Sequence, residues 1–364
     1  MPEHIVAIPA RDERARIGGC LEALFRQSSD RPLGVFLLLN NCVDGTADLV
    51  RATPPPPHVE LRCREVDLPA HLCSAGVARC LAMQGAAAWA GPHGVLLTTD
   101  ADGAVAPSWL EGNIAALGRA DAVAGRAVID AEEARAIPQS LHDADALECQ
   151  LGDLQDEIAS LLDPDPADPW PRHAENSGAS LAVTAAAYAR VGGMTPVPSG
   201  EDRAFVHSLR RIDARVRHAP EVWVRVSGRT LGRAAGGMAE TIARRMVRPD
   251  PFLDDRLEPL AAALRRARLR RMARLWFRHR IGDVDLLACR LRVADAASVL
   301  RAGRWFGTAW DELERRSAVL ARTLVPANAV AVEIARATRA RDALRSSVSL
   351  DAAAPDESRV VLTA

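Results

Sequence analysis

Four strand-length segments alternate with helix-like patterns in the first hundred residues of this chain. Residues 5–8, 35–39 and 94–97 are continuous apolar runs, and residues 59–66 alternate between apolar and polar side chains. Segments with apolar residues at helical spacing follow the predicted strands at residues 5–8, 35–39 and 59–66. Continuous apolar strands that alternate with helices are typical of a parallel sheet with helices on both faces. The pattern predicts an α/β fold with a mostly parallel central sheet, whose first strand ends at Pro9.

Polar turns follow these predicted strands, at residues 9–13, 40–46, 67–76 and 100–103. In parallel sheets, ligands bind beyond the carboxyl ends of the strands, so we expect the four turns to meet at one edge. The last turn carries Asp100 and Asp102. Two carboxylates at the end of a buried strand can hold a divalent cation against a diphosphate.

The rest of the chain divides into a mixed part and a helical part. Helices are predicted at 107–117 and 131–162, and strands at 122–129, 180–183 and 216–226. The Pro-rich residues 163–173 predict a loop, which we expect at the mouth of the site. No strand pattern follows residue 232. We expect a catalytic domain at 1–230, a helical region at 231–345 and a disordered tail at 346–364.

Composition excludes several classes of function. The 364 residues have a net charge of −1, which does not favour nucleic-acid binding. No apolar run could span a bilayer, and the N-terminus lacks the pattern of a signal peptide. The seven cysteines form no Cys-x-x-Cys pair, which favours free thiols in a reducing cytoplasm. We therefore expect a cytoplasmic protein, with peripheral contact at the inner membrane face left open.

The sequence contains no lysine. A Schiff base to pyridoxal phosphate and a Walker-type phosphate lysine are therefore excluded. Arginine can still bind phosphate through two parallel hydrogen bonds.

Five motifs in order resemble those of family 2 glycosyltransferases, which have a GT-A fold. The resemblance covers about residues 4–230 and departs from the family pattern at Asp12, where Asn is usual, and at Asn40, where Asp is common. The motifs lie at residues 5–13, 39–46, 76–79, 100–102 and 192–203.

The resemblance implies a hexosyl-type transferase that uses a nucleotide-sugar donor and Mg²⁺ or Mn²⁺. It assigns Asp102 to the cation and Asp100 to the ribose or to a metal-bound water. His218 is a candidate third ligand, although a single His is more often structural. Residues 226–229 carry no His where some relatives have one, so Arg229 and Arg233 could instead cover the diphosphate.

The remaining donor-binding candidates come from the same turns. Asp67 could instead cap a turn or a helix, Glu13 could be only a capping residue, and Arg79 could lie on a solvated helix face. The full set of expected donor-binding residues is Pro9, Ala10, Arg11, Glu13, Asn40, Asn41, Asp44, Asp67, Gly76, Arg79, Asp100, Ala101 and Arg229.

Asp202 is the candidate general base, with Glu201 beside it. A partly desolvated carboxylate can accept the proton of an acceptor hydroxyl, provided the reaction inverts the anomeric centre. The alternative is an acidic pair that caps a helix beginning at Arg203.

Arginines crowd residues 265–280 around Trp276 and Phe277. A basic amphipathic helix can lie on anionic lipid or pack on a second copy of the chain. The alternative is a solvated helix balanced by nearby acidic residues.

Two rival functions stay open. One is a catalytically silent scaffold that binds a partner through these helices. The other is a sugar-phosphate nucleotidyltransferase. Such enzymes usually open with a Gly-rich loop that contains Arg, and they carry a Lys, whereas residues 8–16 of this chain contain no Gly and the chain contains no Lys. The sugar, the acceptor and the stereochemical outcome are not specified by the sequence.

Overall fold

The computed structural model describes residues 2–232 and 236–353, the last six of these by their backbone only. The chain forms two compact units that interleave along the sequence. The first comprises residues 1–141, 171–249 and 304–308, and the second comprises 142–170, 250–303 and 309–364. Residues 142–170 thus group with the C-terminal helices, and the expected domain boundary at residue 230 stays a prediction.

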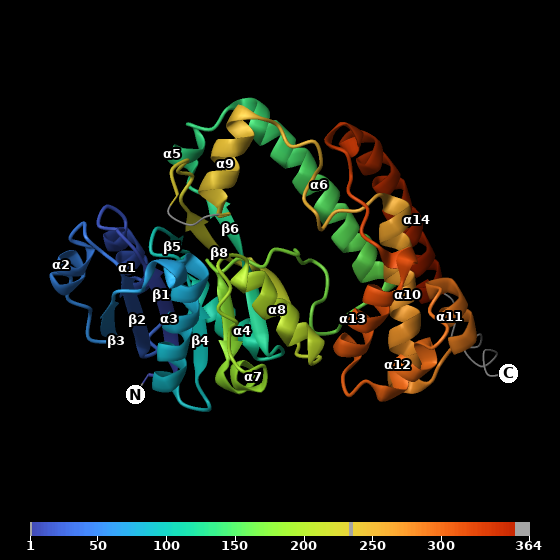
Figure 1. Cartoon of the computed structure of the whole chain (residues 1–364), viewed down its shortest axis with the longest axis horizontal. Helices are drawn as coiled ribbons and strands as arrows, with labels where there is room; N and C mark the ends of the chain where they lie inside the picture. The colour runs from blue at the N-terminus through green and yellow to red at the C-terminus, as the bar shows by residue number, and fades with distance from the viewer. Residues whose placement is uncertain (1, 233–235, 354–364) are drawn as a thin grey trace. The chain divides into compact units, whose positions relative to one another are not determined.

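The first unit contains all the strands of the described chain (Figure 1). Its elements are β1 (His4–Ala10), α1 (Ile17–Phe25), β2 (Leu33–Asn40), α2 (Thr46–Arg51), β3 (Val59–Val66), η1 (Ala70–Leu72), α3 (Ala75–Ala90), β4 (Val95–Thr98), β5 (Ala104–Val105), α4 (Trp109–Leu117), β6 (Ala122–Ile129), α5 (Ala131–Ala134), β7 (Leu181–Thr184), α7 (Ala185–Arg190), α8 (Glu201–Arg211), β8 (Val216–Val226) and α9 (Met238–Val247).

The strands form one sheet in the order β3-β2-β1-β4-β7-β6-β8-β5. Strands β3, β2, β1 and β4 are parallel, as are β6 and β8. Strand β7 runs antiparallel to both of its neighbours, and β5 runs antiparallel to β8. The predicted α/β class is confirmed, with a mixed sheet in which the first four strands of the chain are all parallel.

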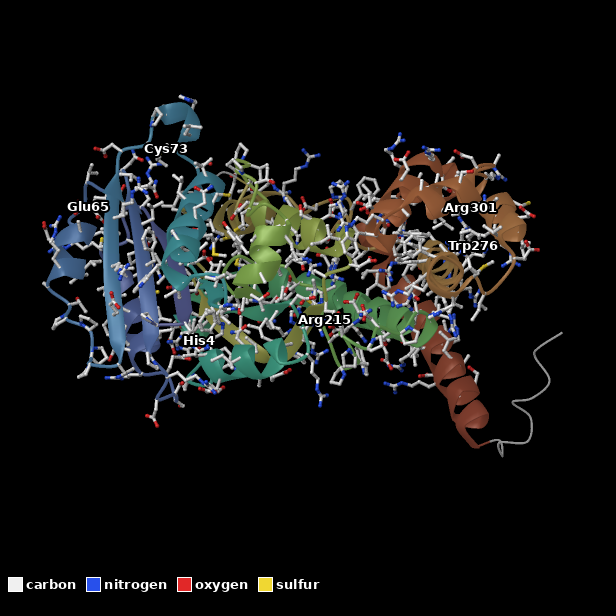
Figure 2. All side chains as sticks on the ribbon, turned by 90° about the horizontal axis from the view of Figure 1, so that it is seen from below. His4, Glu65, Cys73, Arg215, Trp276 and Arg301 are labelled. Carbon is white, nitrogen blue, oxygen red and sulfur yellow. The ribbon has the colours of Figure 1, made fainter. Side chains whose placement is uncertain are left out.

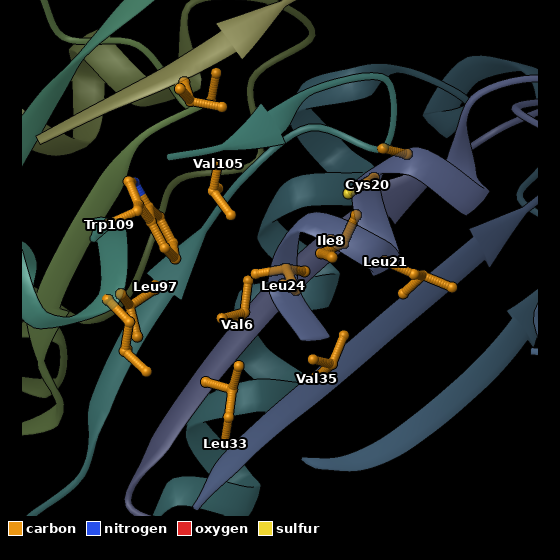
Figure 3. Close-up of a cluster of buried hydrophobic side chains, with 14 of the residues drawn as sticks. Val6, Ile8, Cys20, Leu21, Leu24, Leu33, Val35, Leu97, Val105 and Trp109 are labelled. Carbon is orange, nitrogen blue, oxygen red and sulfur yellow. The ribbon is translucent and has the colours of Figure 1, made fainter. Parts of the chain in front are cut away.

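Side-chain alternation along β1 explains why helices cover both faces of the sheet. Val6 and Ile8 pack in one core with helix α1, whereas Ile5 and Ala7 pack in a second core with α3. Figure 3 shows the first core, in which Leu21 and Leu24 of α1 lie against Val6, Ile8 and Val35. Each fully buried aliphatic side chain contributes about 1.5–3 kcal/mol by its removal from water. Strands β1, β2, β3 and β4 are parallel, so the turns that follow them emerge at one edge of the sheet.

The first strand continues through Pro9 to Ala10, so the prediction that Pro9 ends it is wrong. Strand β4 pairs with β1 only as far as Ala7, which leaves one side of β1 without a neighbouring strand at Pro9. A proline is tolerated there because its missing N–H removes no bond of that ladder.

The second unit is helical in its described residues. Its elements are most of α6 (Gln139–Leu162), α10 (Leu260–His279), α11 (Val284–Leu291), α12 (Ala296–Ala302), most of α13 (Phe306–Arg316), η2 (Ala318–Leu320), η3 (Ala327–Ala329) and α14 (Val330–Ala353). Helix α14 includes residues 346–353, which corrects the prediction of a disordered tail there; residues 354–364 lie outside the described residues. Residues 163–173 form the predicted loop.

Acidic partners balance arginines of α10. Arg266 forms ion pairs with Glu258 and Glu314, and Asp163 accepts hydrogen bonds from both Arg270 and Arg274. The interpretation of a helix balanced by nearby acids is confirmed for these three arginines. Arg301 and Arg280 lie over the ring of Trp276, and Figure 2 labels Trp276 and Arg301. Within residues 2–232 and 236–353, we find no helix whose length and apolar character would let it cross a membrane.

Candidate functional site

The turns after β1 and β2 are joined by hydrogen bonds at one edge of the sheet. The Asp12 carboxylate accepts a bond from the Val43 N–H at 2.7 Å, and the Asp44 carboxylate accepts one from the Arg14 N–H at 2.9 Å. Asp12 has φ +51° and Gly45 has φ +84°, values that Asp and Gly tolerate better than most residues. The sequence therefore places residue types that accept this backbone where the two turns touch.

The turn after β3 joins the same group through Asn41. The Asn41 side chain donates to the Leu68 carbonyl at 3.0 Å and accepts from the Leu68 N–H at 3.2 Å. Its carbonyl oxygen also accepts a bond from the thiol of Cys73, which receives a bond from Arg11. Figure 2 labels Cys73 on this turn. Asn40 lies buried below the turn, whereas Asp67 is exposed.

Asp44 has a clear structural role. Its carboxylate accepts bonds from both the hydroxyl and the backbone N–H of Thr46 and from the Arg14 N–H. Burial raises the pKa of Asp44, but these hydrogen bonds outweigh it and hold the pKa below its usual value. The prediction that Asp44 contacts a nucleoside stays a prediction; the geometry places Asp44 as the residue that ties two turns together.

Arg79, in helix α3, connects the fourth turn to the start of α8. Its buried guanidinium donates to Thr98 at 2.8 Å, to the Gly178 carbonyl at 2.9 Å, to Asp100 at 2.5 Å and to Glu201 at 2.8 Å. Burial lowers the pKa of Arg79, but Asp100 and Glu201 raise it by more than burial lowers it. The net pKa lies above its usual value, so the side chain stays charged. In this arrangement the guanidinium is used within the protein, and we assign it to positioning rather than to phosphate.

Gly76, one turn earlier in α3, allows the close approach of the loop before α8. A Cβ atom at this position would overlap the Val197 carbonyl oxygen and lie 3.0 Å from Oε2 of Glu201. The glycine predicted as a donor-binding residue therefore has a packing requirement of its own.

Asp202 lies beside this network, at the N-terminus of α8. One carboxylate oxygen accepts a bond from the Gly178 N–H at 2.8 Å, and the other accepts one from the Arg203 N–H at 2.7 Å. Gly178 also accepts a bond from Arg79 through its carbonyl. Asp100, Glu201 and Asp202 are therefore joined through Arg79 and Gly178. Glu201 is buried against Arg79, whereas Asp100 and Asp202 are partly exposed.

Arg229 follows β8 and reaches the turns after β1 and β4. It makes a bidentate ion pair with Glu13, at 2.8 and 3.1 Å, and lies 2.9 Å from a carboxylate oxygen of Asp102. The sequence placed Glu13, Asp102 and Arg229 in one site, and the structure brings these three together.

Asp102 is the most electrostatically perturbed carboxylate of the site. Burial and the neighbouring Asp100 raise its pKa to about 6, against the opposing influence of Arg229. A pocket of about 220 Å³ adjoins it, with Arg16, Cys20, Glu133 and Arg225 among its lining residues. Burial also raises the pKa of the Cys20 thiol, which therefore stays protonated.

His218 lies away from this group. It pairs with Ala124 near the start of β8, four residues and about 13 Å along β6 from the Val128–Arg225 pair. The ring lies 3.0 Å from Arg210, 3.1 Å from Asn176 and edge-on to His173. The structure therefore does not bring the predicted third metal ligand to Asp102, because the strand register sets it in another cluster.

Asp102 and Asp100 fit a divalent cation whose remaining coordination positions are filled by substrate phosphate and water. Within the described parts of the chain, no three His, Cys, Asp or Glu side chains form a preassembled metal site. Mg²⁺ is commonly held by one or two carboxylates together with substrate phosphates and water. The donor set is thus adequate for a cation bound with a diphosphate, and it supplies hard oxygen ligands of the required kind.

Sequence reasoning missed Glu133 as a residue that shapes the site. Its carboxylate accepts bonds from the Ser227 hydroxyl at 2.8 Å and the Gly228 N–H at 2.7 Å, and it pairs with Arg16. These bonds hold the backbone from which Arg229 extends. A side chain at Gly228 would press on Ile129, so Gly228 was the one local sign of this contact.

Comparison with known proteins gives one family match and a set of distant structural similarities. The sequence model described as glycosyl transferase family 2 matches residues 5–160. No curated protein matches the chain.

The similar solved structures include two that carry nucleotide sugars. TarS 1–349 of S. aureus, in complex with UDP-GlcNAc, is 13% identical over 86% of this chain and 91% of its own, with a TM-score of 0.47. The mannosyltransferase PcManGT from Pyrobaculum calidifontis, in complex with GDP-Man and Mn²⁺, is 16% identical over 96% of this chain and 86% of its own, with a TM-score of 0.42. Similarities this distant assign no ligand to the present chain.

The family match covers the first four strands and the turn that carries Asp100 and Asp102. Residues 5–160 therefore match the model of glycosyl transferase family 2, the family that their motifs predicted.

Proposed function

We propose that this protein transfers a glycosyl group, of hexosyl type, from a nucleotide-diphosphate sugar to an acceptor hydroxyl. The observation that carries the proposal is the buried Arg79, which binds Asp100 and Glu201 with one guanidinium. It holds the turn that carries Asp100 and Asp102 close to the start of α8. Such a transfer requires the groups that bind the diphosphate and the general base to lie in one site, on the two sides of the reacting carbon.

The nucleoside is proposed to bind at the turns after β1, β2 and β3. These turns are hydrogen-bonded to each other, and they present backbone groups at residues 9–13 and the exposed carboxylate of Asp67. A base with donor and acceptor edges, such as uracil, can pair with groups of this kind.

The diphosphate is proposed to bind at Asp100, Ala101 and Asp102 with Mg²⁺ or Mn²⁺. The bound cation would supply Lewis-acid neutralisation of the leaving diphosphate. Asp102 suits this role because it is a buried carboxylate next to a second carboxylate, an arrangement that a cation relieves. His218 is left out of the proposed ligand set because its ring belongs to the cluster with Arg210 and Asn176.

Asp202 is proposed as the general base and Glu201 as a positioning residue. The backbone N–H groups of Gly178 and Arg203 orient the Asp202 carboxylate, and each of its oxygens keeps a further lone pair for a proton. As the acceptor oxygen bonds to the anomeric carbon, its proton passes to Asp202 and the bond to the diphosphate breaks. This role applies to an inverting reaction; a retaining one would leave Asp202 in a positioning role.

A thermal-shift screen of nucleotide sugars with and without Mn²⁺ tests the proposal. A ligand that binds only the folded protein raises its melting temperature, by an amount that grows with concentration above Kd. At least one nucleotide sugar should give a shift that needs both Mn²⁺ and Asp102, and D102N should abolish it. The matched control is D48N, since Asp48 is a surface residue of α2 that pairs with Arg51.

The rival functions predict other results. A nucleotidyltransferase would consume a nucleoside triphosphate and release pyrophosphate. A silent scaffold would show neither this reaction nor a shift that depends on Asp102. Either result would overturn the proposal.

A further inference from the structure

Arg229 already serves as a cation for Asp102. Its guanidinium binds both oxygens of Glu13 and one oxygen of Asp102, and the Glu13 side chain is almost fully buried. The backbone that carries Arg229 is held by Glu133 through Ser227 and Gly228. The contact is therefore built into the fold on both sides, rather than made by a free surface side chain.

A metal ion and Arg229 need the same carboxylate. The Asp102 oxygen that pairs with Arg229 is one that a cation would use, and the described residues include no three-ligand group that could bind a metal without it. A cation beside Asp102 would lie close to the Arg229 guanidinium, and the two positive groups would repel each other. Cation binding at Asp102 is therefore weakened for as long as Arg229 stays paired with it.

The side chains paired around the site carry excess negative charge. Four carboxylates, on Glu13, Asp100, Asp102 and Glu201, share the guanidinium groups of Arg79 and Arg229. A diphosphate would be repelled by this set unless a further cation entered with it. A guanidinium that leaves a carboxylate finds an equally suitable bidentate partner in phosphate.

We propose that Arg229 competes with the divalent cation for Asp102, so that the cation binds tightly only together with a diphosphate that takes over the Arg229 guanidinium. The inference rests on the proposed donor site and adds the order in which its ligands bind. By linkage, the diphosphate and the cation then strengthen each other's binding by the same factor. In the absence of the nucleotide-sugar donor, Asp102 stays paired with Arg229 and the protein binds the metal weakly.

Mn²⁺ alone is the probe, with free Mn²⁺ followed by electron paramagnetic resonance in a titration without nucleotide. R229Q removes the charge and keeps similar length, so it should bind Mn²⁺ at least tenfold more tightly than the wild type. R229K keeps the charge and should stay near the wild type. R51Q is the matched control, since Arg51 is an exposed arginine of α2 that pairs with Asp48 and Glu65 rather than with Asp102, and it should not change the Kd.

Two further variants keep the test decisive. The double variant D102N/R229Q should lose the gain, and E133Q, which loosens the backbone of Arg229, should give a smaller gain in the same direction. Unfolding curves establish that each variant is folded. Equal or weaker Mn²⁺ binding by a folded R229Q protein would overturn the inference, as would a gain that survives D102N.

The two proposals fail in different ways. If R229Q has no effect on Mn²⁺ but a nucleotide sugar still gives an Asp102-dependent thermal shift, the donor proposal stands and the competition is wrong. If R229Q tightens Mn²⁺ binding but no nucleotide sugar binds, the competition stands and the donor proposal is wrong.

Discussion

Asp100 and Glu201 bind the same guanidinium, that of Arg79, which lies 21 residues from the first and 122 from the second along the chain. The pair of contacts joins the carboxyl end of β4 to the N-terminus of α8. One buried side chain therefore positions both the turn proposed to bind the diphosphate and the helix start that carries the proposed base, Asp202.

Removing this side chain should destabilise the protein strongly. R79M leaves Asp100 and Glu201 without their shared positive partner, and breaking a buried ion pair on one side costs about 3–5 kcal/mol. R79K should recover only part of this, since an ammonium cannot reproduce the four planar contacts. Urea unfolding at pH 7 measures the effect.

The control for this experiment is R51M, at an exposed arginine of α2 that pairs with Asp48. A surface pair contributes about 0–1 kcal/mol, so the change should be small. An R79M protein as stable as R51M would refute the view that Arg79 holds the site together.

Gly76 and Gly18 should respond in opposite ways to alanine. A Cβ at Gly76 meets the Val197 carbonyl, so G76A must displace the loop before α8 and should cost at least about 2 kcal/mol. A Cβ at Gly18 meets nothing within 4 Å, and Gly18 lies in helix α1, so G18A should be neutral or stabilising by up to about 1 kcal/mol. Thermal unfolding of the two variants provides the comparison, and equal melting temperatures would contradict the close approach at Gly76.

Glu133 should make the protein sensitive to acid. Burial raises its pKa, but hydrogen bonds from Arg16, Ser227 and Gly228 outweigh this and lower it below 4.5. The stability that Glu133 contributes is then present above its unfolded pKa and is lost as pH falls through the folded value. E133Q should therefore be less stable than the wild type at pH 7, with a difference that shrinks toward pH 3.

Denaturant midpoints at pH 7, 5, 4 and 3 measure this convergence. Asp44 and Asp121 also have lowered pKa values, so some acid sensitivity should persist in E133Q. An E133Q protein whose loss of stability is the same at all four pH values would show that Glu133 does not titrate as described.

Asp202 should affect turnover more than donor binding. D202N keeps an oxygen for one of the two backbone N–H groups, so the fold and the nucleotide-sugar thermal shift should be retained. Loss of a general base costs about 10²–10⁴-fold in rate. Parallel measurement of kcat and of the thermal shift separates the two effects, and loss of both together would argue for a purely structural Asp202.

The convergence of the polar turns could be predicted from sequence because it depends on strand direction alone. Apolar runs at residues 5–8 and 35–39 identify buried parallel strands, and parallel strands end at one edge. The Val43 N–H donates to Asp12 and the Asn41 side chain donates to the Leu68 carbonyl, which confirms that the turns after β1, β2 and β3 meet there.

The partners of each side chain could not be predicted in the same way. His218 depends on the register of β8 against β6, which is interrupted by a bulge at Gly125 and Arg126. Its strand was predicted with the correct bounds, but one-residue changes in register move every side chain to the other face. Arg79 similarly required knowledge of where α8 packs, which no local pattern contains.

Glu133 shows the same limit at longer range. It was predicted only as part of an acidic helical stretch, yet its contacts with Ser227 and Gly228 come from a segment almost a hundred residues away. Charge patterns indicate that such a residue needs a partner, and the tertiary fold alone decides which one.

Release of a nucleoside diphosphate from a nucleotide sugar is the most direct test of the central claim, that Asp102 and Asp202 act in one donor site. With Mn²⁺ present, the wild type and D48N should release it at equal rates, whereas D102N and D202N should each be slower by at least about 100-fold. Equal rates in all four proteins, or no release from any nucleotide sugar, would contradict the account.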